Sequence, residues 1–434
     1  MPGSHVGAFR AAPDSDTRNG DAVIHSLPNE LLADIFQLGH RTYDTSDENV
    51  MRYLSAISSV CRIWRDVALN VSSLWTNIVY EERSDMRAVS RGLSRVEERI
   101  ATCILRSRNS SLAIRLWFGH YGRGLAQLKD MISPHLSRCC SIDVEFAYGH
   151  QASQLFPLPG RLDRLTALSC KVRLHDSTSL VLFSADDGPR LQDMSLLMRG
   201  VHAHFPSASI HVEHLTKLRL GGDYRQWQDP IRFVSRCHSL RYLKLAIYPL
   251  GPFPPFTLPK LSHLQTFGLG FASIIHTPNL QSLTIFDALD AGSSGDTPVV
   301  PPTLCLPSLR VLRFLEVDVM RPDVGVFLES NPTIEVLQLF RCGPLSQDSY
   351  ESDSDEALWV EDGQSVMGVM SVMSDGTDRG FLPSLKLLQT PWKVGILREH
   401  NRMVVRFATR AAPRRGRGDP GWGTDQPRAR RPHP

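Results

Sequence analysis

The chain has 434 residues, enough for up to three domains of about 150 residues or for one extended domain. Hydrophobic residues make up 42% and charged residues 21%, a globular balance that excludes collagen-like and wholly disordered classes. The net charge is only +3, so no strong electrostatic attraction draws the whole chain to nucleic acid or to a membrane.

The beginning of the chain and its cysteines indicate a compartment. Residues 1–22 are polar and lack the pattern of a signal peptide, and we expect them to be disordered. The longest charge-free run, residues 261–286, is interrupted by Pro278 and is a poor membrane span. Eight cysteines without a CxxC motif are typical of reduced thiols. We therefore expect a cytoplasmic or nuclear protein that is not in the membrane.

Residues 26–76 carry the clearest helical periodicity. In SLPNELLADIFQL, apolar residues recur every three or four positions, and Pro28 suits a first helical turn. We expect a polar loop at residues 39–50 and then a second helix. One unbroken apolar face of that helix is formed by Leu54, Ile57, Cys61, Trp64 and Ala68. A closing Leu74-Trp75 completes a small helical unit.

Two motifs in this unit, LPxELLxxIF from Leu27 and VCRxWRxxA from Val60, resemble an F-box, over about 50 residues. The F-box is the three-helix motif by which substrate receptors dock onto the Skp-family adaptor of cullin-RING ubiquitin ligases. The resemblance implies an F-box at residues 23–80. It also implies that nine residues contact the adaptor or support the surface that does: Leu27, Pro28, Leu31, Ile35, Phe36, Leu54, Val60, Cys61 and Trp64. The alternative is an ordinary helical hairpin whose apolar residues only form a core.

Residues 81–108 are predicted to form a linker helix, because their apolar residues are spaced by three or four positions from Met86 to Ile104. A rigid helix here would couple the helical unit to the rest of the chain. Leu112, Ile114 and Leu116 then alternate with a period of two, which predicts a strand.

The remainder of the chain contains an internal repeat of the form LxxLxL. Copies start at Leu191, Leu215, Leu240, Leu264, Leu280, Leu309 and Ile334, and weaker copies at Cys139, Leu165 and Leu385. Most of the distances between successive starts are close to the 20–29 residues that form one unit of a leucine-rich repeat.

The repeat resembles irregular leucine-rich repeats, in which stacked strands bury a continuous leucine core. The asparagine that usually stands three residues after the strand motif is missing, since Gly221-Gly222-Asp223 follow Leu220 and Phe340-Arg341-Cys342 follow Leu339. The predicted fold class is therefore α+β. It consists of an N-terminal three-helix F-box joined by a helix to an irregular α/β leucine-rich-repeat-like solenoid over residues 109–408. The alternative is an ordinary β-rich domain with leucine-rich strands.

Two segments have biased composition. Residues 343–378 contain nine acidic residues and no Lys or Arg, which suits a solvated loop without a regulatory role or, less simply, an acidic phosphorylation site. Residues 409–434 are rich in Arg, Gly and Pro, and we expect a disordered tail. Arg-Gly clusters can contact RNA, but the tail is short, so nucleic acid is an unlikely partner.

No motif for catalysis or for nucleotide, calcium or zinc binding is present. The histidines His202, His204, His211 and His214 have metal-like spacing, but we expect loop histidines and no metal site. We predict no catalytic residue, no cofactor and no enzymatic activity.

The third, fifth and seventh positions of each repeat are expected to face away from the leucine core. Aromatic and arginine residues at such positions suit a protein-binding surface. The candidates for target binding are Arg219, Tyr242, Lys244, Phe286, Arg313 and Phe340. The alternative is that Phe286 and Phe340 are half-buried against neighbouring loops.

The favoured function is that of a substrate-recognition subunit of a Skp–cullin–F-box ubiquitin ligase. The F-box would bind the Skp-family adaptor, and through it a cullin, while the repeats bind an unknown target protein. The alternatives are an adaptor-bound scaffold without a ligase role, a leucine-rich-repeat interaction protein, or an RNA-binding protein that acts through its tail. An enzyme is the least favoured class.

Overall fold

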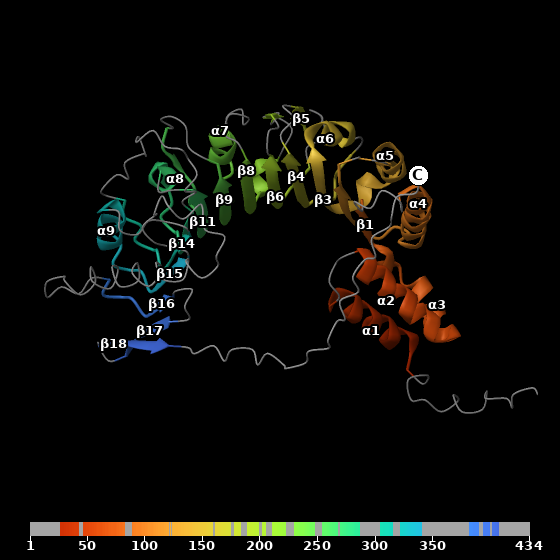
Figure 1. Cartoon of the computed structure of the whole chain (residues 1–434), viewed down its shortest axis with the longest axis horizontal. Coiled ribbons are helices and arrows are strands. Elements are labelled where there is room, and N and C mark those ends of the chain that lie inside the picture. Colours follow the sequence, from red (N-terminus) through yellow and green to blue (C-terminus); the bar gives the residue numbers. More distant parts are fainter. Residues whose placement is uncertain are drawn as a thin grey trace, which may run out of the picture.

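The computed structural model describes residues 27–42, 47–82, 89–120, 122, 124–158, 161–174, 178–183, 189–198, 202–204, 211–222, 230–247, 254–267, 270–286, 304–315, 322–340, 382–389, 394–399 and 402–407. The predictions for residues 1–22, 343–378 and 409–434 lie outside this part. Three helices pack together at one end of a long curved sheet, and further helices line the outer side of the arc (Figure 1).

The helical unit contains α1 (Asn29–Thr42), α2 (Asp47–Val60), α3 (Arg62–Asn70) and the 3-10 helix η3 (Ser72–Trp75). Leu32, Phe36 and Leu54 are part of its buried core. Two predictions were wrong here. Most of the segment predicted as a polar loop is helical, and the predicted single second helix is two helices.

Cys61 is the reason for that break. Its backbone is extended, with φ −155° and ψ 176°, and its Sγ accepts a hydrogen bond from the Trp64 amide at 3.5 Å. Cys61 therefore caps the start of α3, so its position in the apolar periodicity does not make it part of a continuous helix.

Helix α4 (Val89–Arg106) lies where the linker helix is predicted, but it follows a first sheet strand, Asn77–Glu81, and therefore connects that strand to the next, Leu112–Phe118. Trp75 is buried and donates its Nε1–H to the Ala68 carbonyl at 2.9 Å, while the Arg106 guanidinium lies 4.4 Å from the centre of the Trp75 ring. Ser72 and Ser110 hydroxyls are hydrogen-bonded at 2.9 Å. The helical unit, α4 and the first strands are thus packed as one piece.

The main sheet has fourteen strands in the described residues, and their spatial order follows the chain with β5, β7, β10 and β12 left out. Neighbouring strands are parallel as far as β16, and β17 and β18 then pair antiparallel. The strands are β1 (Asn77–Glu81), β2 (Leu112–Phe118), β3 (Cys139–Tyr148), β4 (Ala167–Leu174), β6 (Asp193–Met198), β8 (Lys217–Gly222), β9 (Tyr242–Ala246), β11 (His263–Phe267), β13 (Ser282–Phe286), β14 (Val311–Leu315), β15 (Val336–Phe340), β16 (Leu387–Gln389), β17 (Val394–Glu399) and β18 (Arg402–Phe407). Strand β1 was not predicted.

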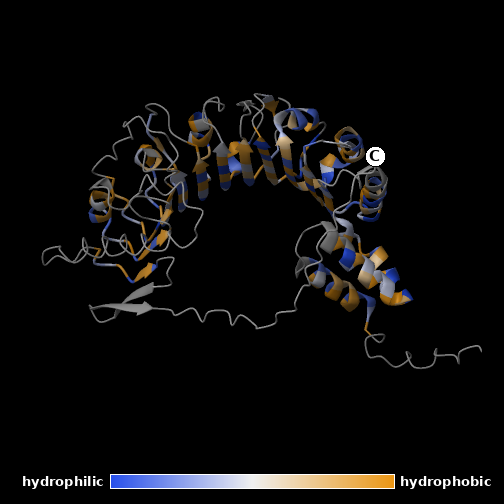
Figure 2. Cartoon of the chain, viewed as in Figure 1, coloured by the Kyte–Doolittle hydropathy of each residue, from blue (hydrophilic) through white to orange (hydrophobic). Residues whose placement is uncertain are grey.

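The repeat motif produces aligned columns of buried side chains. One column joins the middle leucine of successive motifs in register: Leu218, Leu243, Leu264, Leu283, Leu312, Leu337 and Leu388. All are at most 1% exposed. Figure 2 shows the hydrophobic and hydrophilic residues alternating along the central strands.

The copy predicted to start at Leu264 was misplaced by three residues. Leu261 begins that unit, Leu264 takes the middle position, and the hydroxyl-bearing Thr266 fills the third buried position. As a result Phe267, predicted as a core residue, is only half-buried on the opposite face of the sheet.

Each unit is also fixed to the next by a repeated backbone contact. The carbonyl of Thr216, for example, accepts hydrogen bonds from the amides of Arg241 at 2.8 Å and Tyr242 at 3.1 Å. The equivalent carbonyl recurs before the other strands, at Thr166, Gln192, Arg241, Ser262, Gln281, Arg310 and Glu335. This pairing satisfies backbone groups that would otherwise be unpaired where the chain enters the sheet.

Short helices cover the outer side of the sheet: α5 (Leu125–Ile132), α6 (Gly149–Leu155), α7 (Pro230–Ser235), α8 (Gly270–Ile274) and α9 (Pro322–Glu329), with 3-10 helices η4 (Ser133–Arg138) and η5 (Val212–His214) (Figure 1). Two short ribbons, β5 (Ser179–Val181) with β7 (His202–His204) and β10 (Phe256–Thr257) with β12 (Ile275–His276), accompany them. The sheet face turned away from these helices is called the inner face. No helix among the described residues has the length and apolar character needed to span a membrane.

Asn331 holds one of the less regular connections. It is 1% exposed, and its Oδ1 accepts from the Leu306 amide at 2.7 Å. Its Nδ2 donates to the carbonyls of Leu304 at 2.9 Å and Phe327 at 2.7 Å. A buried asparagine thus caps backbone groups in this unit, although it lies before the repeat motif at Ile334 and not after a strand.

Candidate functional site

Helix α1 exposes a stripe of apolar side chains. Leu31, Ile35 and Leu38 lie on one side of the helix and are 49%, 49% and 65% exposed. Leu32 and Phe36, on the other side, are both 1% exposed and pack in the core. The apolar stripe, defined as Leu31, Ile35 and Leu38, is therefore available to another molecule.

A second exposed apolar site lies where α2 ends and α3 begins. Val60 is 57% exposed and Ile63 is 42% exposed. The Cys61 cap between them turns the chain, so that neither residue is drawn into the core. Covering half-exposed residues of this size contributes about 1 kcal/mol each to binding.

The structure divides the nine predicted adaptor residues into two groups. Pro28, Leu31, Ile35 and Val60 are exposed, so they can make contact directly. Phe36 and Leu54 are buried, and Leu27, Cys61 and Trp64 are partly buried.

The residues of the second group have structural contacts within the unit. The rings of Phe36 and Trp64 meet edge to face at 4.9 Å, and Leu27 packs against the core. These residues therefore support the exposed surface from below. Sequence analysis did not assign Leu38 and Ile63 to this surface, although Leu38 continues the spacing of the predicted helix.

His40 and Tyr53 close the far end of α1. Tyr53 donates its hydroxyl hydrogen to the Phe36 carbonyl at 2.9 Å, and its ring centre lies 6.3 Å from that of His40. Burial lowers the pKa of His40, because the surroundings disfavour its charged form. No hydrogen-bond partner for His40 Nε2 lies among the described residues.

The predicted target-binding residues all lie on the inner face of the sheet and are partly exposed. Arg219 on β8 is 3.4 Å from Asp193 on β6, and its guanidinium lies 5.4 Å from the Tyr242 ring centre. Lys244 Nζ lies 5.2 Å from the ring centre of Phe286. Side chains from β6 to β13 are thus joined by charge and ring contacts across the strands.

The C-terminal part of the inner face is more polar in its middle row. Arg313 donates to the Gln338 side chain, which in turn donates to Gln389 Oε1 at 2.7 Å. Phe286 is half-buried, and the ring that lies 5.9 Å from its own is that of Phe267 on the neighbouring strand β11, whereas the alternative interpretation placed it against loops. Phe340 is half-buried as well.

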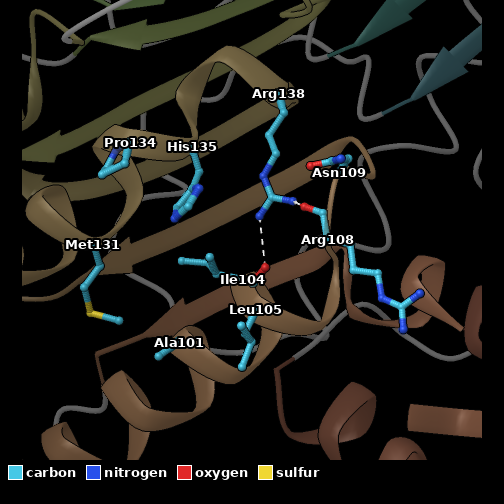
Figure 3. A pocket seen from close by; sticks show the side chains of 9 residues that line it. All are labelled: Ala101, Ile104, Leu105, Arg108, Asn109, Met131, Pro134, His135 and Arg138. Atoms are coloured by element: carbon cyan, nitrogen blue, oxygen red, sulfur yellow. Dashed lines mark hydrogen bonds between the residues drawn. The ribbon is translucent and has the colours of Figure 1, made fainter. Parts of the chain in front are cut away.

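A shallow groove of about 780 Å³ lies between α4 and η4, at the junction of the helical unit and the sheet (Figure 3). Its apolar lining includes Leu105 and Met131. Arg138 crosses it and donates hydrogen bonds to the carbonyls of Ile104, at 3.0 Å, and of Arg108. These bonds satisfy carbonyls at the end of α4. Together with the contact between Arg106 and Trp75, they fix α4 against both the helical unit and the sheet, and these contacts of Trp75, Arg106 and Arg138 are called here the brace.

The surroundings of the candidate metal-ligating histidines and of two buried cysteines are defined in the part of the chain that the structure describes. No group of three or more His, Cys, Asp and Glu side chains there could hold a metal ion, and His211 and His214 instead flank Glu213 at 3.1 and 3.7 Å. Burial raises the pKa of the Cys139 and Cys237 thiols to about 12, which keeps them protonated and unreactive at neutral pH.

Comparison with known proteins agrees with this description of the helical unit. Residues 24–81 match the F-box-like family model, a segment that covers α1 to β1. The unit is therefore an F-box-like domain. No curated protein and no solved structure matches the chain.

Proposed function

We propose that the chain is a substrate-recognition subunit of a Skp–cullin–F-box ubiquitin ligase. Its F-box-like domain binds a Skp-family adaptor, and through it a cullin, while the sheet binds a target protein. The chain supplies proximity and no catalytic residue, since ubiquitin transfer is carried out by other subunits. The complex works in the cytoplasm or the nucleus.

The exposed apolar side chains of the F-box-like domain carry the proposal. Leu31, Ile35, Leu38, Val60 and Ile63 remain exposed in a folded unit whose core is already complete. Apolar residues gathered on a small domain are typical of a surface that is covered in a complex. The family match at residues 24–81 supports a Skp-family adaptor as the molecule that covers them.

We further infer that the sheet region is an irregular leucine-rich-repeat-like solenoid. One short strand per unit, parallel neighbours in register and a continuous leucine column support this inference. Solenoids of this kind offer a long inner surface, which suits recognition of another protein.

The test measures binding of the full chain to a purified Skp-family adaptor. Ile35→Glu and Val60→Glu each place a charge in the proposed contact and weaken binding about 100-fold, because a charge buried without a partner is costly. Both residues are exposed, so both variants keep the thermal unfolding curve of the wild type.

Leu105→Glu is the matched control. Leu105 is 78% exposed, and it lies on α4 outside the F-box-like domain, so this variant binds the adaptor as the wild type does. A folded wild-type chain that fails to bind the adaptor would refute the proposal. Cullin must also enter the complex only when the adaptor is present.

A further inference from the structure

The inner face has an excess of positive charge. From β4 to β14 its outward-facing positions include one acidic residue, Asp193, among those described. The cationic residues at these positions are Lys171, Arg173, Lys217, Arg219, Lys244 and Arg313. The described residues between Lys217 and Leu315 contain no Asp or Glu on either face.

The charges on the earlier strands are paired within the sheet, and those on β8 and β9 are paired only in part. Glu145 on β3 pairs with both Lys171, at 3.7 Å, and Arg173. Asp193 on β6 lies 3.4 Å from Arg219 and opposite Lys217 in register, so one inner-face acid stands beside three cations of β8 and β9. Lys217, Arg219 and Lys244 therefore form a positive centre, called here the cationic patch.

Two members of the cationic patch lie next to one another in register. Arg219 on β8 is paired with Lys244 on β9, and neighbouring strands lie about 4.8 Å apart. Like charges directly opposite one another on adjacent strands destabilise a sheet. An anion that contacts both side chains would remove this repulsion.

Aromatic rings hold these cations in place before any ligand arrives. The Arg219 guanidinium lies over Tyr242, and the Lys244 ammonium lies over Phe286. Side chains restrained in this way lose less conformational entropy on binding. The arrangement therefore favours direct contact with anionic groups at fixed positions on a ligand over nonspecific attraction of mobile anions.

The row of the inner face beside the cationic patch is apolar. In the register of the strands, Leu197, Gly221, Ala246, Phe267, Phe286 and Leu315 follow one another across β6 to β14. Two parallel rows, one cationic and one apolar, thus run across the strands.

We propose that the cationic patch and this apolar row bind an extended acidic segment of the target protein, in which Asp or Glu residues alternate with apolar residues. The proposal rests on the proposed function, because it names the kind of target that the sheet region captures. The strands β6 to β14 cover about 24 Å across the sheet, the length of about seven extended residues.

A protein segment fits this surface better than a nucleic acid does. Nucleic-acid grooves combine phosphate contacts with exposed aromatic rings on which bases stack. Here Tyr242 and Phe286 already lie beneath the chain's own cations, and the neighbouring row is aliphatic in part. Carboxylates with apolar neighbours match both rows.

The experiment uses the full chain and a fluorescein-labelled peptide of about 10 residues, with Glu at alternate positions and Leu or Ser between. Fluorescence anisotropy is expected to show that this peptide binds at least about 10-fold more tightly than the same peptide with Gln in place of Glu. Lys217→Glu/Lys244→Glu removes this preference. Higher salt weakens the binding of the Glu peptide, since screening acts on exposed charges.

Arg161→Glu/Lys260→Glu is the control, because it changes the net charge equally at exposed residues in the turns before β4 and β11. This variant keeps the wild-type affinity for the Glu peptide. Equal binding of the Glu and Gln peptides would overturn the proposal, as would equal loss in the control variant. Tighter binding of single-stranded RNA at the same patch would overturn it too.

The same variants separate this proposal from the proposed function. Lys217→Glu/Lys244→Glu keeps wild-type adaptor binding, and an unchanged urea unfolding curve, followed by circular dichroism, shows that its sheet is folded. Ile35→Glu loses the adaptor and keeps the peptide. If the wild-type chain does not bind the adaptor, the ligase role is refuted, and the peptide measurement remains interpretable.

Discussion

The F-box-like domain and the inner face of the sheet present opposite chemistry to their surroundings. The first leaves the apolar side chains of Ile35 and Val60 49% and 57% exposed. The second presents Arg219 and Lys244, each held against an aromatic ring. Removing an apolar surface from water stabilises a complex, whereas a cationic surface mainly raises the association rate and the selectivity for an anionic partner. The two regions are therefore suited to different kinds of partner.

Loss of a core leucine should have the largest effect and should show whether the two regions share stability. Leu243→Ala removes a fully buried side chain from the leucine column and is expected to lower the free energy of unfolding by about 2–5 kcal/mol. Urea unfolding followed by circular dichroism measures this loss.

The matched variants for Leu243→Ala are Leu105→Ala, which is exposed, and Leu54→Ala, in the core of the F-box-like domain. The first leaves the unfolding midpoint unchanged. If Leu54→Ala and Leu243→Ala shift one and the same transition, the two regions unfold together. Two separate transitions would show that the brace through Trp75 does not couple them.

An intermediate loss of stability, confined to the sheet region, is expected when Asn331 is replaced. Asn331→Ala removes a buried side chain that satisfies one amide and two carbonyls. Leaving these groups unpaired is expected to cost about 2–3 kcal/mol, measured by urea unfolding. Adaptor binding at a temperature where the variant is folded stays at the wild-type level. A change below about 0.5 kcal/mol would contradict the structural role.

The smallest effect concerns pH and the F-box-like domain alone. Because burial lowers the pKa of His40, the folded state binds a proton there less readily than the unfolded state does. The contribution of His40 to stability is present above its ordinary pKa of about 6.5 and is lost as the pH falls below that value. Lowering the pH from about 7.5 to 5.5 should thus reduce Tm more in the wild type than in His40→Leu, as measured by thermal unfolding at the two pH values. Equal shifts in both proteins would exclude this role of His40.

Much of the fold could be predicted from periodicity, because burial repeats wherever the repeat does. The leucines of most strand motifs lie at the positions their spacing predicts, and so does the helix around Leu31. Prediction failed where one residue type replaced another of similar shape. Thr266 fills a leucine position through its methyl group, so the motif was placed three residues too late.

The candidate surfaces were harder to predict than the core. Helical spacing alone made Cys61 part of a continuous helix, since a sequence pattern does not show the extended backbone of a cap. A short motif also gives no measure of exposure: Phe36 and Ile35 are adjacent in it, yet one is buried and the other half-exposed. The restraint of Arg219 and Lys244 by rings on other residues required the three-dimensional register of the strands.

The brace formed by Trp75, Arg106 and Arg138 has a consequence for timing and reach. A flexible tether lets a bound molecule explore a wide volume, so its effective concentration near a second site is diluted. Here the C-terminal turn of α4 contacts both regions, because Arg106 lies over Trp75 and the Ile104 carbonyl accepts a hydrogen bond from Arg138. A molecule bound at the inner face is therefore kept at a constant distance and angle from a molecule bound at α1, because both are attached to one rigid unit. This fixed geometry determines which part of a protein bound at the inner face can be reached by a molecule bound at α1.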